Sequence, residues 1–400
     1  MSTNSAQLKI AIVGAGPVSL TLANILQNNN IPFSIFEAAD RFRTSGGSLD
    51  LHPESGQLAL KEAGLWDAFV QNSRPESDCD KVVNIDGEVL WDENLLKKEE
   101  KSMEEQFAGR PEIDRRLLMK ILFDNLKSEH IVFGKKLDHI TPSSSQNTKY
   151  NLNFVDGTQD NDFDLIIGSD GAWSKVRTLL SDTKPQYSGI SMLEVNCTDI
   201  SANPWLLNYV GIGSMFAFGE GKAVIAQRQG DGSLRTYAAL RVPENFLDTC
   251  GIDWTQQDTA RKQFVDKYFS EIGEDLKRVV LECKDTLTPR SLYELPVGFS
   301  WPDRSGITLV GDAAHVMTPF AGVGVNVGMT DALVLGREIV AVAQGRKGLD
   351  EGVVAYEREM FPRAKKYMAR TEKGKVGHFS ADGSKHFADR MRAHHEQGAR

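Results

Sequence analysis

Apolar and polar positions alternate along this chain in two different periods. Near the N-terminus a short apolar run at 8–13 precedes a segment with helical apolar spacing at 17–29, and a second apolar run follows at 33–36. The same order returns near the other end, with an apolar run at 307–310 and a helical pattern at 326–344. Strands that alternate with helices predict an α/β fold with a parallel sheet, to which both ends of the chain contribute.

The middle of the chain has a different pattern. Between 185 and 299 the apolar positions form short strand-like pieces, with one helical segment near 260–269, which predicts an inserted domain built on an antiparallel sheet. Asp86-Gly87 predicts a hairpin turn within 82–91. The remaining predicted elements are helices at 54–63, 112–126 and 352–370, and strands near 131, 137, 150–154 and 165–167.

Two glycines separate the first strand from the first helix. Gly14 and Gly16 allow a tight turn and let the backbone approach a pyrophosphate, which the unpaired amides at the start of the helix, near Pro17 and Val18, would bind. Glu37 ends the second strand about 20 residues later, where a carboxylate accepts hydrogen bonds from a ribose hydroxyl. An ordinary tight turn is the alternative, but strand, turn, helix, strand and acid in register favour a dinucleotide site.

A second glycine-bearing segment follows the strand at 307–310. It begins with Gly311 and Asp312, includes His315, and continues into the glycine-rich run 322–326 at the start of the long helix. The positive end of that helix would favour negative charge beside it. We expect this segment to complete the dinucleotide site. A helix-capping carboxylate is the alternative role of Asp312, and His315 serves either a structural hydrogen bond or catalysis.

Composition narrows the classes of function. The chain has 400 residues, which is long enough for two domains. Its formal net charge is −9, which is too acidic for a surface that binds nucleic acid. Its four cysteines lack paired spacing, and no apolar stretch reaches membrane-spanning length. Half of its eight histidines fall after residue 372, in a tail that we expect to be solvated rather than metal-binding. We therefore predict a cytoplasmic monomer without a metal site.

Three motifs in this order resemble those of the FAD-dependent aromatic monooxygenases, the group of para-hydroxybenzoate hydroxylase. The first is Gly14-Ala15-Gly16, the second is the run 164–171 with Ser174 and Arg177, and the third is Gly311-Asp312 with Pro319. The segments 46–52 and 311–326 are most similar to those of the tetracycline-inactivating members. The resemblance covers residues 8 to about 365 and implies a Rossmann-like FAD-binding domain, an inserted antiparallel-sheet substrate domain and a long C-terminal helix.

The resemblance also implies a reaction. FAD would be the resident cofactor, and NADPH or NADH would bind transiently, because the chain has no second complete strand-glycine-helix fingerprint. The enzyme would insert one oxygen atom from O2 into a phenolic or polycyclic aromatic substrate through a flavin C4a-hydroperoxide. The alternatives are a flavoprotein reductase that inserts no oxygen, and a non-catalytic FAD-binding or drug-binding protein. A halogenase of this fold would carry a Trp-x-Trp-x-Ile-Pro segment, which the sequence lacks.

The chain divides accordingly. The FAD-binding domain would comprise 1–184 and 300–345, with some strands of the substrate domain within 75–110. The substrate domain would comprise 185–299. After the second segment of the FAD-binding domain, a bridging helix would comprise 346–372 and a polar tail 373–400.

The residues expected to bind the cofactor lie in the glycine motifs, in the loop 46–52 and where the helix begins at Arg115. They are Gly14, Gly16, Pro17, Val18, Glu37, Arg41, Gly47, Ser48, Asp50, Arg115, Asp170, Gly171, Gly311, Asp312, Pro319, Gly322, Gly324, Val325 and Asn326. Among these, the resemblance implies that Asp312 hydrogen-bonds the ribityl chain. Pro319, Phe320 and Gly322 are expected over the flavin, and no side chain is assigned as catalytic.

The residues expected to contact the substrate are Gln227, Arg235, Tyr237, Phe320, Ala321 and Gly322. Arg235 and Gln227 stand where the tetracycline-inactivating group has a histidine and a drug-contacting asparagine, which favours a different multi-ring phenolic substrate. An arginine can pair with a phenolate or a carboxylate. The alternative for Arg235 is a solvent-facing position on an edge strand.

Overall fold

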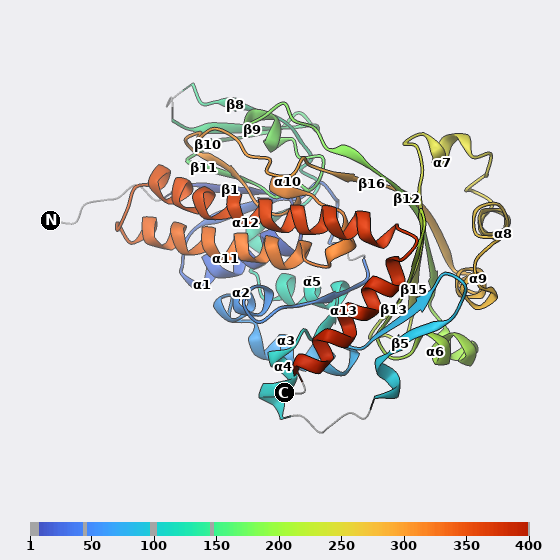
Figure 1. Cartoon of the computed structure of the whole chain (residues 1–400). Helices are drawn as coiled ribbons and strands as arrows, with labels where there is room; N and C mark the ends of the chain where they lie inside the picture. Colours follow the sequence, from blue (N-terminus) through green and yellow to red (C-terminus); the bar gives the residue numbers. More distant parts are fainter. Residues whose placement is uncertain (1–7, 43–45, 97–101, 145–147, 399–400) are drawn as a thin grey trace.

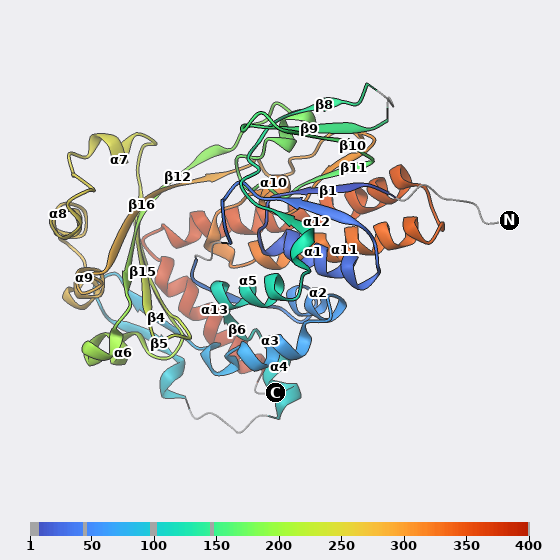
Figure 2. The same cartoon turned by 180° about the vertical axis from the view of Figure 1, so that it is seen from behind.

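The computed structural model describes residues 8–42, 46–96, 102–144 and 148–398. The outer ends of the predicted domains, at 1–7 and 399–400, lie outside the described residues. Figures 1 and 2 show two parts: an α/β part that contains residues 8–42, and a large twisted sheet that extends from it. This arrangement confirms the predicted fold class.

A parallel sheet of five strands forms the centre of the α/β part. Its strands lie in the order β17-β11-β1-β2-β7, and every neighbouring pair is parallel. They are β1 (Ile10–Val13), β2 (Phe33–Phe36), β7 (Ile131–Val132), β11 (Leu165–Gly168) and β17 (Ile307–Leu309). Helices cover one face, and a three-stranded sheet of β8 (Leu137–Pro142), β9 (Tyr150–Phe154) and β10 (Gln159–Phe163) covers the other. Burial on both faces explains why β1 and β11 are apolar throughout.

Three long helices pack side by side on this sheet: α1 (Pro17–Asn28), α11 (Gly324–Ala343) and α12 (Leu349–His378). Glycines in α11 set the distance between α11 and α1. A Cβ atom at Gly328 would lie 2.6 Å from a methyl of Val18, and one at Gly336 would lie 2.9 Å from a methyl of Ile25. Because α11 carries no side chains there, it approaches α1 closely, and the N-termini of the two helices lie near each other.

The shorter elements of this part surround the helices. They are α2 (Gly56–Glu62), α3 (Trp66–Asn72), α4 (Met103–Ala108), α5 (Arg115–Asp124), α10 (Asp312–His315), β3 (Ser48–Asp50) and β6 (Glu112–Asp114). The glycine-rich segment 46–52 is therefore not entirely loop, since Ser48–Asp50 pairs with Glu112–Asp114. The local pattern does not show this strand because its partner lies far along the chain.

The second part is a seven-stranded sheet with the order β16-β12-β15-β14-β13-β4-β5. Its strands are β4 (Asp80–Asn84), β5 (Val89–Asp92), β12 (Gln186–Cys197), β13 (Ser214–Gly219), β14 (Lys222–Arg228), β15 (Leu234–Arg241) and β16 (Thr286–Glu294). The outer helices are α6 (Pro204–Val210), α7 (Phe246–Thr249), α8 (Gln257–Tyr268) and α9 (Glu274–Leu281). Two of these strands, β4 and β5, lie within 75–110, and β4 pairs with β13 in parallel, so the sheet is mixed rather than wholly antiparallel.

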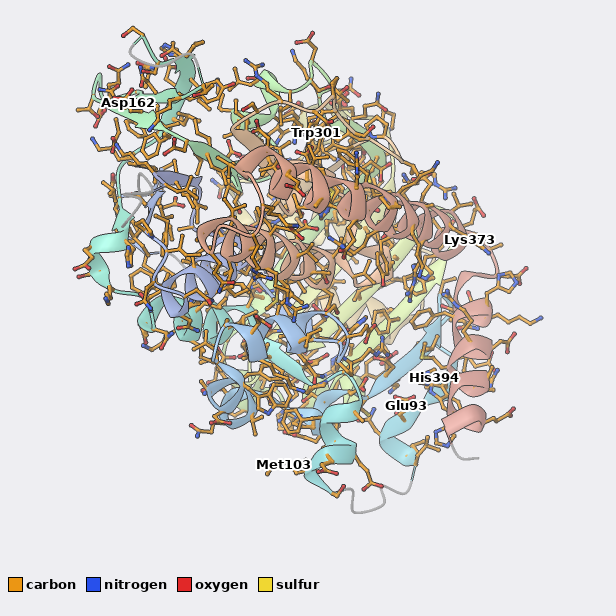
Figure 3. The ribbon with its side chains drawn as sticks, turned by 90° about the vertical axis from the view of Figure 1, so that its left-hand side faces the viewer. Glu93, Met103, Asp162, Trp301, Lys373 and His394 are labelled. Atoms are coloured by element: carbon orange, nitrogen blue, oxygen red, sulfur yellow. The ribbon has the colours of Figure 1, made fainter. Side chains whose placement is uncertain are left out.

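The C-terminal segment is folded, and the prediction of a solvated tail from residue 373 is wrong. α12 continues to His378, and a further helix, α13 (Gly383–Gly398), packs on β13, β4 and β5. Ser384 anchors α13 to the sheet, because its hydroxyl accepts from the Phe218 amide at 2.7 Å and donates to the Val83 carbonyl at 2.7 Å. Figure 3 shows Lys373 near the end of α12 and His394 on α13 on one side of the molecule. The many charges of α13 conceal a narrow apolar face in the sequence.

Within the described part of the chain, no helix combines the length and the apolar character needed to cross a membrane.

Candidate active site

A cavity of about 2980 Å³ lies between the two parts of the molecule. Ligand pockets usually measure roughly 300–1,000 Å³, so this cavity has room for a cofactor and a substrate together. Its walls come from the loops that follow the parallel strands, from the inner face of the seven-stranded sheet, and from α12 and α13. The functional residues predicted from the sequence can therefore be tested by whether they line it.

Two helix N-termini open into this cavity. Gly16, Pro17 and Val18 line it at the start of α1, and Gly324 and Val325 line it at the start of α11. Neither N-terminus has a capping side chain, so among the residues that the structure describes its first amides have no partner. A Cβ atom at Gly16 or Gly324 would meet nothing within 4 Å, so these glycines face open space rather than packed chain. Unpaired amides and positive helix ends fit an anionic dinucleotide such as FAD.

Gly14 and Glu37 shape the first turn rather than line the cavity. Gly14 has φ of +99°, and a Cβ atom there would lie 2.5 Å from the Ser169 carbonyl oxygen, which explains the need for glycine. One carboxylate oxygen of Glu37 accepts from the Ala15 amide at 2.8 Å, and the other accepts from the Ala39 amide at 2.8 Å. Each oxygen keeps a free lone pair, so Glu37 can hold the turn and still accept from a ribose hydroxyl.

Asp170 and Arg177 connect the second motif to the third. The Asp170 carboxylate accepts from the Ser174 hydroxyl and from the Lys175 amide, and it does not line the cavity. Arg177 Nη1 donates to the Ala313 carbonyl at 2.9 Å. Asp170 therefore fixes the turn that places Gly171 in the cavity wall. Its geometry does not show the predicted direct contact with the cofactor.

Asn326 also acts through its neighbours. Its Oδ1 accepts from the His52 amide at 2.9 Å, and its Nδ2 donates to the Asp50 carbonyl at 2.8 Å. Asn326 thus fastens the segment that carries Ser48 and Asp50 to α11 without lining the cavity itself. Arg41, also predicted to bind the cofactor, is exposed and lies outside the cavity wall.

The remaining residues predicted to bind the cofactor all line the cavity. They are Gly16, Pro17, Val18, Gly47, Ser48, Asp50, Arg115, Gly171, Gly311, Asp312, Pro319, Gly322, Gly324 and Val325. The N-cap of α10 is Gly311, and Asp312 makes no capping hydrogen bond, so the alternative role of Asp312 as a helix cap is wrong.

The structure gives His315 a structural contact. Its Nε2 lies 2.6 Å from Asp331 Oδ2, and both side chains are fully buried. Burial opposes a charge on this imidazole, but the Asp331 carboxylate outweighs it and raises the pKa of His315. The residue does not line the cavity, so of the two predicted roles the structure supports the hydrogen bond.

All six residues expected to contact the substrate line the cavity, three of them on the sheet. β15 lies between β12 and β14, so the placement of Arg235 on a solvent-facing edge strand is wrong. Arg235 Nη1 donates to Glu194 at 2.6 Å, and Arg290 Nε donates to the other oxygen of Glu194 at 2.7 Å. Two guanidinium groups share one carboxylate, which leaves this wall with a net positive charge. Burial raises the pKa of Tyr237 to about 12, so its phenol stays protonated.

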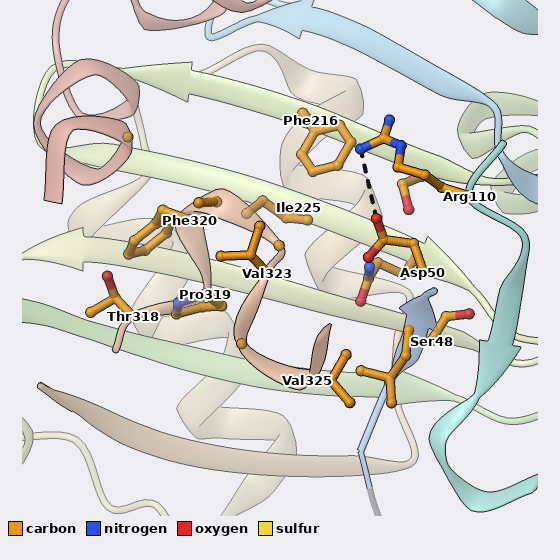
Figure 4. A pocket seen from close by; sticks show the side chains of 18 of the residues that line it. Ser48, Asp50, Arg110, Phe216, Ile225, Thr318, Pro319, Phe320, Val323 and Val325 are labelled. Carbon is orange, nitrogen blue, oxygen red and sulfur yellow. Dashed lines mark ion pairs between the residues drawn. The ribbon is translucent and has the colours of Figure 1, made fainter. Parts of the chain in front are cut away.

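The segment Pro319–Ala321 forms the opposite wall (Figure 4). Phe320 and Val323 lie beside the sheet residues Phe216 and Ile225 in this view. Gly322 has φ of +64°, a conformation that glycine adopts without strain and that turns the chain into α11. The aromatic side chains and the glycine turn give this region of the cavity an apolar lining.

Several cavity residues were not predicted from the sequence. Arg110 lines the cavity, and its Nη1 lies 3.6 Å from Asp50 Oδ2, an ion pair that Figure 4 marks. Asp80 and Ser214 line the wall on adjacent strands, and His378 and Phe387 line it from α12 and α13. Only the pairing of distant segments brings these residues together, and no local motif marks them.

Comparison with known proteins places the chain in a family. The family model described as an FAD binding domain matches residues 7–371. Monooxygenase penA of Penicillium thymicola is 32% identical, and the alignment covers 92% of this chain and 95% of that protein. The chain belongs to this family of FAD-dependent monooxygenases. Its cofactor is FAD, as the two uncapped helix N-termini and the resemblance had led us to expect.

Solved structures show the same fold. HpxO of Klebsiella pneumoniae, complexed with FAD and uric acid, has a TM-score of 0.75 at 18% identity and covers 97% of this chain and 93% of its own. The tetracycline destructase Tet(51) has a TM-score of 0.67 at 18% identity and covers 96% of this chain and 95% of its own. The sequence-based expectation of a Rossmann-like FAD-binding domain with a substrate-domain sheet is confirmed.

Proposed function

We propose that this monooxygenase holds FAD between the N-termini of α1 and α11 and places a planar multi-ring aromatic substrate against the inner face of the seven-stranded sheet. One observation carries the proposal: two uncapped helix N-termini open into a cavity whose opposite wall is a sheet face that carries both apolar and polar side chains. The structural relatives named for uric acid and for tetracycline share this fold, and both molecules are fused-ring compounds.

The cavity-lining residues divide by chemistry. Gly16, Val18, Gly171, Gly311 and Asp312 would hold the anionic and ribityl portions of FAD. Gly47, Ser48, Asp50, Arg115 and the segment 319–325 would surround its ring system. When bound, FAD would supply the redox chemistry, with NADPH or NADH as the hydride donor and O2 as the source of the oxygen atom.

The protein's own contribution is positioning and the exclusion of water. The N-terminus of α11 favours negative charge beside Gly324 and Val325. Phe216, Ile225 and Phe320 exclude water from the substrate side of the cavity and present flat apolar surface to aromatic rings. Gln227, Arg235 and Tyr237 supply donors for the polar edge of the substrate.

We also propose that the protein is a cytoplasmic monomer. Both helix N-termini and the sheet wall come from one chain, so the cavity is complete without a second copy. All four cysteines are free thiols, which suits a reducing compartment. Light scattering coupled to size-exclusion chromatography would measure the mass of the protein in solution. The mass of a dimer would contradict the proposed monomer but not the proposed activity.

A product mass spectrum tests the proposed activity. The FAD-loaded protein is incubated with NADPH and air in the presence of tetracycline and a panel of smaller multi-ring phenols. A gain of one oxygen atom, absent without NADPH, supports the monooxygenase. NADPH oxidation that yields hydrogen peroxide with every substrate supports the reductase, and no NADPH oxidation supports a binding protein.

A further inference from the structure

A line of polar side chains crosses the inner face of the seven-stranded sheet. Backbone pairing places Asp80, Ser214, Gln227 and Arg235 opposite one another on the adjacent strands β4, β13, β14 and β15. All four line the cavity. Adjacent strands lie about 4.8 Å apart, so this polar row extends for roughly 14 Å. A row of this length can pair with several polar groups along one edge of a fused-ring molecule.

An apolar row runs beside the polar row. It consists of Phe216, Ile225 and the aromatic ring of Tyr237, each two positions along its strand from a member of the polar row and therefore on the same face of the sheet. Phe216 and Ile225 appear on the sheet in Figure 4. A planar ring system resting on the apolar row would present one edge to the polar row.

The side chains of the polar row have unused hydrogen-bonding capacity. Within the described part of the chain, the Asp80 carboxyl, the Ser214 hydroxyl and the Gln227 amide have no hydrogen-bond partner, although the backbone groups of these residues are bonded. Ser214 is only 4% exposed. These side chains face the cavity, so a ligand there could form hydrogen bonds with them without breaking any within the described part of the protein.

The two ends of the polar row differ in charge. At one end Arg235 and Arg290 flank Glu194, which favours a ligand oxygen. At the other end burial, together with the carboxylates of Glu93 and Asp78, raises the pKa of Asp80, and Arg110 is the nearby cation that opposes this shift. A ligand N–H can donate to the Asp80 carboxyl in either protonation state, whereas a ligand acceptor can pair only with its protonated form.

We propose that the polar row selects a fused-ring lactam as the substrate, an inference that rests on the proposed function. Its ring N–H donates to Asp80, and the adjacent carbonyl oxygen accepts from Ser214. Oxygen substituents further along the same edge accept from Gln227 and Arg235. The assignment makes the four residues determinants of specificity and assigns no step of the oxygen transfer to them.

Calorimetric titration of the FAD-loaded protein with three probes tests this assignment. Carbostyril has the lactam N–H, coumarin replaces it with a ring oxygen, and N-methylcarbostyril replaces its hydrogen with a methyl group. We expect carbostyril to bind the wild type about tenfold more tightly than either of the other two. Because this comparison needs no variant, misfolding cannot affect it.

A matched pair of variants locates the selectivity. Asp80→Leu should abolish the preference for carbostyril over coumarin. Asp78→Leu removes a neighbouring carboxylate that lines the cavity but lies off the polar row, and it should keep the preference. Equal binding of the three probes to the wild type, no binding of carbostyril, or retained preference in Asp80→Leu would each overturn the assignment. Failure to bind FAD at all would instead contradict the proposed function.

Discussion

Asp331 of α11 holds His315 of the third motif through a contact of 2.6 Å between Oδ2 and Nε2. The same oxygen accepts from the Gly311 amide at 2.9 Å, and the other oxygen accepts from Arg363 of α12 at 3.1 Å. One buried carboxylate therefore joins the turn that begins the cofactor motif to the two longest helices. The position of Gly311 in the cavity wall depends on this contact.

The His315–Asp331 pair should make stability depend on pH. The pKa of His315 is raised, so its contribution is complete below about pH 6.5 and is lost as the pH rises through the folded pKa. The pKa of Asp331 is lowered, so its contribution is present above about pH 4 and is lost as the pH falls through the folded pKa. The pair should therefore stabilise most between about pH 4 and 6.5.

His315→Gln should lower the free energy of unfolding by about 3–5 kcal/mol near pH 6, because it leaves Asp331 without one of its buried partners. The difference from wild type should shrink as the pH rises. Urea denaturation across this pH range measures both effects. His139→Gln, at an exposed pair with Asp138, is the control and should change stability little. A pH-independent loss in His315→Gln would contradict the ion pair.

Arg177 should set the affinity for FAD without touching it. Arg177→Gln removes the charged hydrogen bond to the Ala313 carbonyl, a contact of a kind that contributes about 1.5–3 kcal/mol. If half or more of this energy positions the third motif, FAD should bind roughly tenfold more weakly. Arg304→Gln, which removes a contact with the Leu179 carbonyl away from the cavity, should leave FAD affinity unchanged. Fluorescence titration of the apoprotein with FAD compares the two variants.

The sequence predicted the α/β part well because its central strands β1 and β11 are apolar throughout and are followed by turns. The strand before Gly14, the strand before Gly168 and the helix after Val323 were all recognisable locally. α13 was missed because its buried face is narrow and most of its residues are polar or charged. The polar row was missed for another reason: Asp80 and Ser214 become neighbours only through strand register, which no local pattern contains.

Arg235 should contribute to substrate affinity. Arg235→Gln removes a cation from the wall shared with Glu194 and Arg290, so an acidic or phenolic substrate should bind about tenfold more weakly. Arg290→Gln removes the other partner of Glu194. The Arg290 side chain is half exposed, so water screens its charge and the substitution should weaken binding less. Changes in flavin absorbance on titration with substrate give both affinities. Unchanged affinity in Arg235→Gln would show that the substrate binds elsewhere in the cavity.

Ser384 should hold α13 against the sheet. Ser384→Ala leaves the Val83 carbonyl and the Phe218 amide without this partner, which should cost about 1–3 kcal/mol locally. Amide hydrogen exchange should accelerate in 383–398 while exchange in α1 and α11 stays unchanged. Ser380→Ala loses only a local bond to the Gly377 carbonyl and serves as the control. Faster exchange in both variants to the same extent would contradict an anchoring role for Ser384.

The central claim is that FAD occupies one cavity between the N-termini of α1 and α11. A crystal structure of the protein with FAD tests it most directly. We predict electron density for the pyrophosphate at the first amides of α1, and for the flavin ring beside Gly324 and Val325. A flavin bound outside this cavity, or a pyrophosphate away from Gly16 and Val18, would contradict the account.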